Sequence, residues 1–176
     1  SITVDGTAFK PSSTITITWD GVNTSTTTTS SSTGTFSKSF TIPEAVYGTH
    51  TVGAHDADNN SAPTKNFSIT PIITISSSSG PVGTQITISG TGFDGSSTMT
   101  LTWDGTDTSS TTSSNTSGSF SSLNYTISTT TGGAHNVNAH DGAGHTAANV
   151  VFTITPTVSI SSISGHAGDT TTLSGD

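Results

Sequence analysis

The chain has 176 residues and a net charge of −8, which results from eleven acidic residues against only three lysines and arginines. Nucleic-acid binding needs cations that displace counterions from phosphates, so this composition excludes nucleic acid as a partner. The absence of cysteine excludes a disulfide scaffold and thiolate chemistry. No apolar stretch is long enough to span a bilayer, so we expect no membrane insertion of this segment.

Apolar residues alternate with threonine and serine at several places along the chain. Residues 14–19 read Thr-Ile-Thr-Ile-Thr-Trp, and residues 98–103 read Thr-Met-Thr-Leu-Thr-Trp. A period of two is typical of a half-buried strand, and the β-branched threonine suits its outward positions. Although only 28% of the residues are hydrophobic, as in a disordered stalk, this pattern predicts a folded β protein.

A long internal repeat organises the sequence. The landmarks Phe9, 19–21 (Trp-Asp-Gly), Phe36, 54–56 (Ala-His-Asp) and Phe67 return as Phe93, 103–105, Phe120, 139–141 and Phe152. The offset changes from 84 to 85 residues through one insertion between Phe120 and Tyr125. We therefore expect three parts: a first repeat at 1–70 that lacks its first strand, a complete second repeat at 71–155, and the opening strands of a third repeat at 156–176.

Seven strands are predicted in the second repeat, separated by turns that contain glycine, aspartate or proline. In chain order they are expected at 72–76, 85–90, 98–103, 106–112, 119–127, 133–139 and 149–155. Seven short strands in such a repeat indicate an immunoglobulin-like sandwich, so the predicted fold is all-β, with tandem seven-stranded immunoglobulin-like β-sandwiches. Strand parity predicts that Trp19 and Trp103 are buried in the two cores.

The second repeat also resembles a known family. Residues 88–93 (Ile-Ser-Gly-Thr-Gly-Phe), 100–105 (Thr-Leu-Thr-Trp-Asp-Gly) and 118–120 (Gly-Ser-Phe) are similar to the bacterial and archaeal Ig-like, or IPT/TIG-like, repeats of secreted surface proteins. The resemblance implies an extracellular or cell-surface location and a role as a spacer or filament body. The sequence departs from that pattern at His55 and His140, where the family commonly has a small residue or threonine.

No arrangement of residues predicts catalysis. Serine is too common for a Ser-His-Asp triad to be specific, and no Gly-Xaa-Ser-Xaa-Gly motif stands between a strand and a helix. The one glutamate, Glu44, has no counterpart in the second repeat, which argues against a carboxylate pair for glycoside hydrolysis. We expect no enzymatic activity and no cofactor.

Residues 56–60 (Asp-Ala-Asp-Asn-Asn) place side-chain oxygens at alternate positions, as calcium loops do. Asp56, Asp58 and Asn60 are therefore weak calcium candidates. The second repeat reads Asp-Gly-Ala-Gly-His at 141–145 and loses these oxygens. A polar turn between the last two strands is the favoured interpretation.

The histidines divide by strand parity. His50 and His135 share the parity of Val52 and Val137 and are expected to form hydrogen bonds at the end of the sandwich. His55 and His140 are expected to face outward.

Five Asn-Xaa-Ser/Thr sequons are candidate sites of N-glycosylation. They begin at Asn23, Asn59, Asn66, Asn115 and Asn124.

Neighbouring repeats meet without a flexible linker, at 69–72 (Ile-Thr-Pro-Ile) and 154–157 (Ile-Thr-Pro-Thr). Because proline restricts the joint, this favours a stiff rod. The predicted function is a structural segment of an extracellular filament, stalk or surface layer, with itself as partner in a head-to-tail or lateral homopolymer. A neighbouring strand or a missing flank would complete the first repeat. The alternative is an adhesin or carbohydrate-binding module with glycans as partners.

Overall fold

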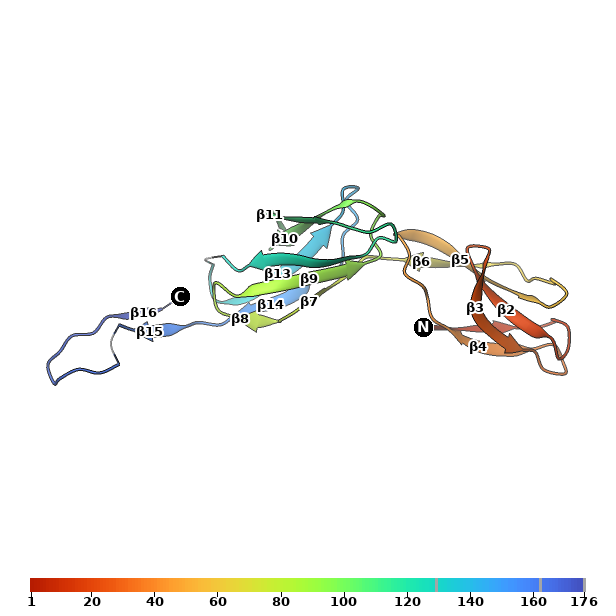
Figure 1. Ribbon diagram of the computed structural model, residues 1–176, viewed down its shortest axis with the longest axis horizontal. Coiled ribbons are helices and arrows are strands. Elements are labelled where there is room, and N and C mark those ends of the chain that lie inside the picture. Colours follow the sequence, from red (N-terminus) through yellow and green to blue (C-terminus); the bar gives the residue numbers. More distant parts are fainter. Residues whose placement is uncertain (129, 162, 176) are drawn as a thin grey trace. The chain divides into compact units, whose positions relative to one another are not determined.

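The computed structural model describes residues 1–128, 130–161 and 163–175, and every regular element in them is a β-strand (Figure 1). None of these residues forms a helix of the length and apolar character needed to cross a membrane. Contacts divide the chain into two compact units, Ser1–Thr70 and Pro71–Asp176. The predicted all-β class is confirmed.

The second repeat is a sandwich of two sheets (Figure 1). One sheet has the order β11-β10-β13-β14-β8 and the other has the order β12-β9-β7. The strands are β7 (Ile72–Ile75), β8 (Ser79–Gly80), β9 (Gln85–Thr91), β10 (Thr98–Trp103), β11 (Thr106–Ser113), β12 (Phe120–Thr126), β13 (Gly133–His140) and β14 (Val150–Ile154). All seven predicted strands are present to within one residue at either end. The unpredicted β8 has two residues, too few for a pattern, and pairs parallel with β14.

The first repeat has the same strands except the counterparts of β7 and β8. Its strands are β1 (Ile2–Gly6), β2 (Thr14–Trp19), β3 (Val22–Thr29), β4 (Phe36–Phe40), β5 (Gly48–Asp56) and β6 (Lys65–Ile69). One sheet has the order β3-β2-β5-β6, and β1 pairs with β4 in the other. Among the described residues β1 has β4 as its hydrogen-bonded neighbour, whereas its counterpart β9 is bonded to both β12 and β7.

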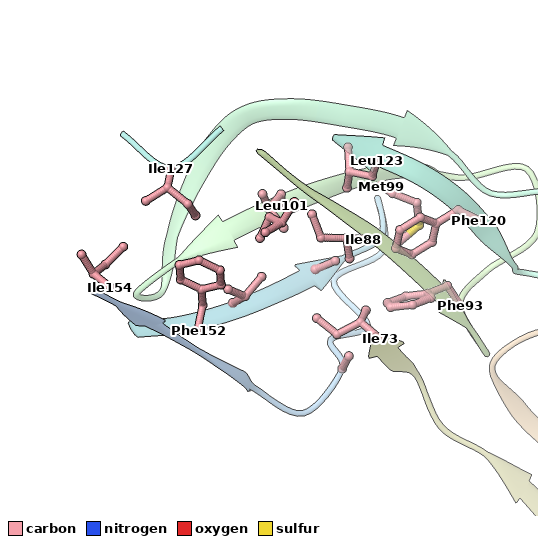
Figure 2. Packing of buried hydrophobic residues seen from close by; sticks show 14 residues of the cluster. Ile73, Ile88, Phe93, Met99, Leu101, Phe120, Leu123, Ile127, Phe152 and Ile154 are labelled. Atoms are coloured by element: carbon pink, nitrogen blue, oxygen red, sulfur yellow. The ribbon is translucent and has the colours of Figure 1, made fainter. Parts of the chain in front are cut away.

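The core of the second repeat lies between its two sheets (Figure 2). Ile88, Leu101 and Phe152 are fully buried there, and Phe93 closes the core beside Phe120 at a ring distance of 5.7 Å. The first repeat has a smaller cluster around Ile15, Ile17 and Phe40. These clusters follow the strand parity of the sequence.

The prediction that both tryptophans are buried was wrong. Trp19 and Trp103 are half-buried and pack against the edge of each core. Each is the last residue of its strand, β2 or β10, so its ring lies at the end of the sandwich. The large fully buried side chains are instead Phe93, Phe152 and several isoleucines.

Two further strands follow the second repeat. β15 (Val158–Ile160) and β16 (Leu173–Gly175) pair antiparallel, with Val158 opposite Gly175 and Ile160 opposite Leu173. β7 and β9 pair in the same register, with Ile73 opposite Gly90 and Ile75 opposite Ile88. Residues 162 and 176 of the expected third part lie outside the described residues, and the division into three parts remains a prediction.

Candidate functional site

The Trp-Asp-Gly motif forms the same tight hairpin in both repeats. Trp19 pairs with Val22 and Trp103 pairs with Thr106, so two residues form each turn. Asp104 and Gly105 have φ values of 48° and 78°, and Asp20 and Gly21 have 49° and 76°. Positive φ at both positions is the geometry that Asp-Gly favours in a two-residue hairpin. The turn places the aspartate beside the neighbouring strand.

That aspartate forms a brace with the tryptophan and a histidine of the adjacent strand. In the second repeat the His135 ring stacks on Trp103 with centroids 5.0 Å apart. Its Nδ1 donates to Asp104 Oδ2 at 2.6 Å, and its Nε2 donates to the Thr131 carbonyl at 2.8 Å. The Asn136 N–H donates to the other oxygen of Asp104. The brace ties the hairpin to β13 at the end of the sandwich.

The first repeat contains the same brace. His50 stacks on Trp19 at 4.9 Å, and its two ring nitrogens face Asp20 Oδ2 at 2.7 Å and the Val46 carbonyl at 3.0 Å. The Thr51 N–H donates to Asp20 Oδ1. Strand parity predicted the place of His50, but it did not predict the stack.

The contacts of the brace favour the imidazolium form of the histidine. A carboxylate and a carbonyl oxygen can only accept, so both ring nitrogens must carry hydrogens to satisfy both bonds. The Asp20 carboxylate, above all, raises the pKa of His50, and the Asp104 carboxylate does the same to the pKa of His135. Reciprocally, these histidines are the main cause of the lowered pKa values of Asp20 and Asp104. The tryptophan face also attracts a cationic ring.

The second pair of histidines lies on the outer face of the larger sheet, as expected. His140 donates from Nδ1 to the Asp141 carbonyl at 3.0 Å and from Nε2 to Asp107 Oδ1 at 3.1 Å. The Asp141 carbonyl, and then the Asp107 side chain, raise the pKa of His140. In the first repeat, His55 contacts Asn23 Oδ1 at 2.9 Å. These histidines cross-link β5 or β13 to the neighbouring hairpin.

The calcium candidates lie together in a turn whose carboxylate is already occupied. Asp56 is fully buried and accepts from the backbone N–H groups of Lys10, Asp58 and Asn60. The Asn60 side-chain amide donates to both Asp56 oxygens and is the largest cause that lowers the pKa of Asp56 to about 2. Asp58 forms an ion pair with Lys10 at 2.8 Å. A cation would have to displace these donors, so the geometry favours the polar turn.

The corresponding turn of the second repeat has a different set of side chains. Asp141 is buried and accepts from the backbone N–H groups of Asp94, Ala143 and His145, and from His145 Nδ1. Burial alone would raise the pKa of Asp141, but the Asp94 N–H and the His145 donors lower it. Asp94, Asp141 and His145 bring three metal-ligand atoms within 4.8 Å of one another. A ligand pattern shared by both repeats does not include Asp94 and His145, because Lys10 and Asn60 occupy their positions in the first repeat.

All five sequon asparagines are exposed, and the structure shows how three of them are held. Asn23 accepts from His55, Asn115 accepts from the N–H groups of Ser117 and Ser119, and Asn124 accepts from the Thr87 hydroxyl. The two remaining sequon positions are Asn59 and Asn66.

Three comparisons with known proteins complement this geometry. The family described as IPT/TIG domain matches residues 71–154, and no curated protein matches the chain. A solved tetra-tandem repeat from the extending region of a large adhesion protein is 22% identical, with a TM-score of 0.37 and coverage of 98% of this chain and 51% of that one.

Two further structures are similar at lower identity. Bacteroides ovatus SGBP-B, solved with a mixed-linkage heptasaccharide, is 18% identical with a TM-score of 0.41, covering 92% of this chain and 49% of that one. The fibronectin(III)-like modules of Clostridium thermocellum CbhA are 15% identical with a TM-score of 0.32, covering 86% of this chain and 84% of theirs. The chain therefore spans about half the length of the first two structures.

The family match covers the repeat for which all seven strands were predicted. The first repeat carries the same hairpin, the same brace and the same order of its four-stranded sheet. Residues 71–154 match the IPT/TIG domain family, and the immunoglobulin-like repeats of the chain are similar to domains of that type.

Proposed function

We propose that this chain is a structural segment of an extracellular filament, stalk or surface layer, built from end-to-end repeats. The supporting observation is that one sandwich is built twice with the same hairpin and brace. Only Thr70 and Pro71 stand between β6 of the first repeat and β7 of the second. Proline restricts both its own φ and the preceding residue, so this link has little conformational freedom.

In this proposal the first repeat is completed by a neighbouring strand or by a flank that precedes residue 1. In the second repeat β7 pairs with the edge of β9, with Thr74 opposite Ser89. The counterpart of β9 is β1, and the counterpart of β7 in the third part is β15. The side chains of Val158, Ile160 and Leu173 in the β15–β16 pair are exposed, so exchanging β16 for β1 would place β15 against an existing core.

The outer edges of the larger sheets support end-to-end rather than lateral backbone pairing. β3 and β11 are edge strands, and each is interrupted by a bulge opposite β2 or β10. At the bulge the Thr108 hydroxyl donates to the Leu101 carbonyl and accepts from the Ser110 N–H. Thr24 makes the same contacts in β3. A bulge whose backbone groups are satisfied locally protects an edge from continuous pairing.

A non-catalytic role at the cell surface is part of the same proposal. The ring nitrogens of His50, His135 and His140 face carboxylate and carbonyl oxygens, so these histidines are not placed to take a proton from a serine. The resemblance to secreted repeats supports the location, and glycans at the exposed sequons would suit it.

Electron microscopy and sedimentation of the purified chain over a range of concentrations test the proposal. Linear assemblies that lengthen with concentration are expected. A chain that stays monomeric at all concentrations would contradict a head-to-tail role. Glycan-array binding by that monomer would favour the adhesin alternative.

One observation favours the alternative function as a glycan-binding module. An open groove of about 380 Å³ lies on the first repeat and is lined by polar and small residues, among them Asn23, His55 and Asn59. Gly53 also lines the groove. In the second repeat Asn138 stands at that position and bonds the Ala147 carbonyl and Asn149. The groove is a candidate site for a hydroxyl-rich ligand.

The variant Gly53→Asn tests this groove. The substitution copies the second repeat and fills the space, since a Cβ at Gly53 would lie 2.7 Å from the Thr18 hydroxyl. If the chain binds a glycan through the groove, array binding should fall more than about tenfold in G53N, as polar ligands lose their paired groups. Unchanged binding in G53N would place the glycan elsewhere.

A further inference from the structure

Three side chains meet in the second repeat where the loop after β9 approaches the loop after β13. His145 Nδ1 lies 3.0 Å from Asp141 Oδ2 and 3.5 Å from Asp94 Oδ1. The three ligand atoms lie within 4.8 Å of one another. The group combines two carboxylates with an imidazole nitrogen, which is a mixed ligand set that borderline divalent ions prefer over calcium.

These distances match the spacing of ligands around a small divalent ion. Bonds of about 2.0 Å in a tetrahedral site separate neighbouring ligand atoms by about 3.3 Å. The two measured distances, 3.0 and 3.5 Å, lie on either side of that value. Rotation of the Asp94 side chain, which is 41% exposed, can bring its carboxylate oxygen to the same distance from the Asp141 carboxylate.

The surroundings hold the central ligand and leave an open side. The Asp141 side chain has no exposed surface, and its Oδ1 accepts from the backbone N–H groups of Ala143 and His145. The Asp94 N–H donates to Asp141 Oδ2. Such outer contacts orient a ligating carboxylate. His145 is 26% exposed, so water can reach the remaining coordination position.

The first repeat shows the same turn built with only one of the three ligands, Asp56, which corresponds to Asp141. Lys10 stands where the second repeat has Asp94, and Asn60 stands where it has His145. The Asn60 amide donates to Asp56, whereas the Lys10 ammonium pairs with Asp58. Both changes in the second repeat introduce a metal ligand at the same place. An amide or an imidazole satisfies the buried carboxylate equally well, but the imidazole nitrogen can exchange its proton for a metal ion.

We propose that Asp94, Asp141 and His145 bind one divalent transition-metal ion of the Zn²⁺ class. The ion takes the position of the proton on His145 Nδ1. That proton moves to Nε2 when the ring is neutral and leaves to solvent when the ring is charged. Two carboxylates balance the two charges of the ion. The bound ion ties the loop after β9 to the loop after β13 and stabilises this end of the repeat.

The test uses the metal-free chain with ZnCl₂ in calorimetry and CoCl₂ in visible absorption. One ion per chain and a tetrahedral Co²⁺ spectrum are expected. The variants H145N and D94K copy the residues of the first repeat, which shows that the turn forms with them. Each should weaken Zn²⁺ binding by more than about tenfold, because even outer-shell partners contribute 10–100-fold. Thermal unfolding without metal verifies that both variants are folded.

A variant that adds the same site to the first repeat tests the proposal in the opposite direction. Lys10→Asp together with Asn60→His gives the first repeat the same three ligands, so this chain should bind a second ion. Failure of the original chain to bind Zn²⁺, or binding that H145N and D94K leave unchanged, would overturn the proposal. A double variant that gains no ion would show that these donors do not make a site, and it would also count against the proposal.

Discussion

The brace at the end of each sandwich brings together a tryptophan, an aspartate and a histidine. Strand parity alone does not predict that these three side chains contact one another. Trp103 caps the core, His135 covers its ring, and Asp104 holds the histidine from a tight turn. The tryptophan is therefore half-buried in apolar contacts and half-covered by a polar ring. A charged imidazolium suits this place, because both of its hydrogens meet acceptors and its face meets an aromatic ring.

The brace makes stability depend on pH. The pKa values of His50 and His135 are raised above 6.5, so their contribution is complete below pH 6.5 and is lost as the pH rises through the folded values. The pKa values of Asp20 and Asp104 are lowered below 3.8, so their contribution is lost as the pH falls through those values. The melting temperature is expected to be highest between about pH 4 and pH 6.5 and to fall above it.

The variant H135F separates this effect from other titrations, because phenylalanine keeps the stack on Trp103 but cannot titrate. Differential scanning calorimetry from pH 5 to 9 should show a smaller decline in the second repeat of H135F than in the original chain. H166F is the matched control, since the His166 side chain is 99% exposed. An equal decline in all three proteins would show that the brace does not cause it.

Some residues of the candidate sites could be predicted from the internal repeat, and others could not. The shared Trp-Asp-Gly turn was predictable, since Asp-Gly is the strongest short signal for a two-residue hairpin. The group of Asp94 and His145 was not, because it arises where the repeats differ and combines two loops about 50 positions apart in sequence. The prediction that the tryptophans are buried failed because strand parity tells which face of the sheet a side chain occupies. Parity does not tell how close the residue lies to the end of its strand.

At the scale of elements, the seven strands of the second repeat follow the alternation and the turn residues closely. Isoleucine alternates with threonine or serine along β9, and that pattern matches its buried and half-buried positions. β8 was not predictable, since two residues joined in parallel to β14 leave no periodic signal. The bulges in β3 and β11 also escaped prediction, because they depend on the register with the neighbouring strand.

The threonine at each bulge should contribute more to the free energy of unfolding than its neighbours on the same strand. Thr108→Val removes both hydroxyl contacts and should lower the free energy of unfolding of the second repeat by about 1 kcal/mol. Thr111→Val, at an exposed position of β11, should change it by less than about 0.5 kcal/mol. Urea unfolding followed by Trp103 fluorescence in a W19F background measures both. Equal losses in the two variants would contradict a specific role for the bulge.

At the scale of the whole molecule, the chain divides into two compact units, and the second unit includes the β15–β16 strand pair. The repeat period predicts a joint at Thr70 and Pro71, because Ile69-Thr70-Pro71-Ile72 has a close counterpart in Ile154-Thr155-Pro156-Thr157, and this division remains a prediction. What completes β1 belongs to the proposed function, since backbone pairing of an edge strand carries little sequence information.

A cysteine pair tests this completion most directly, and the absence of native cysteine gives it a clean background. In the second repeat Thr74 lies opposite Ser89, so a donated β15 places Ser159 opposite Asp5 of the next subunit. Under mild oxidation, the double variant D5C/S159C should form a ladder of trimers and longer oligomers on a non-reducing gel. The single variants D5C and S159C should stop at dimers. A double variant that yields only monomers and dimers would contradict head-to-tail assembly through β15.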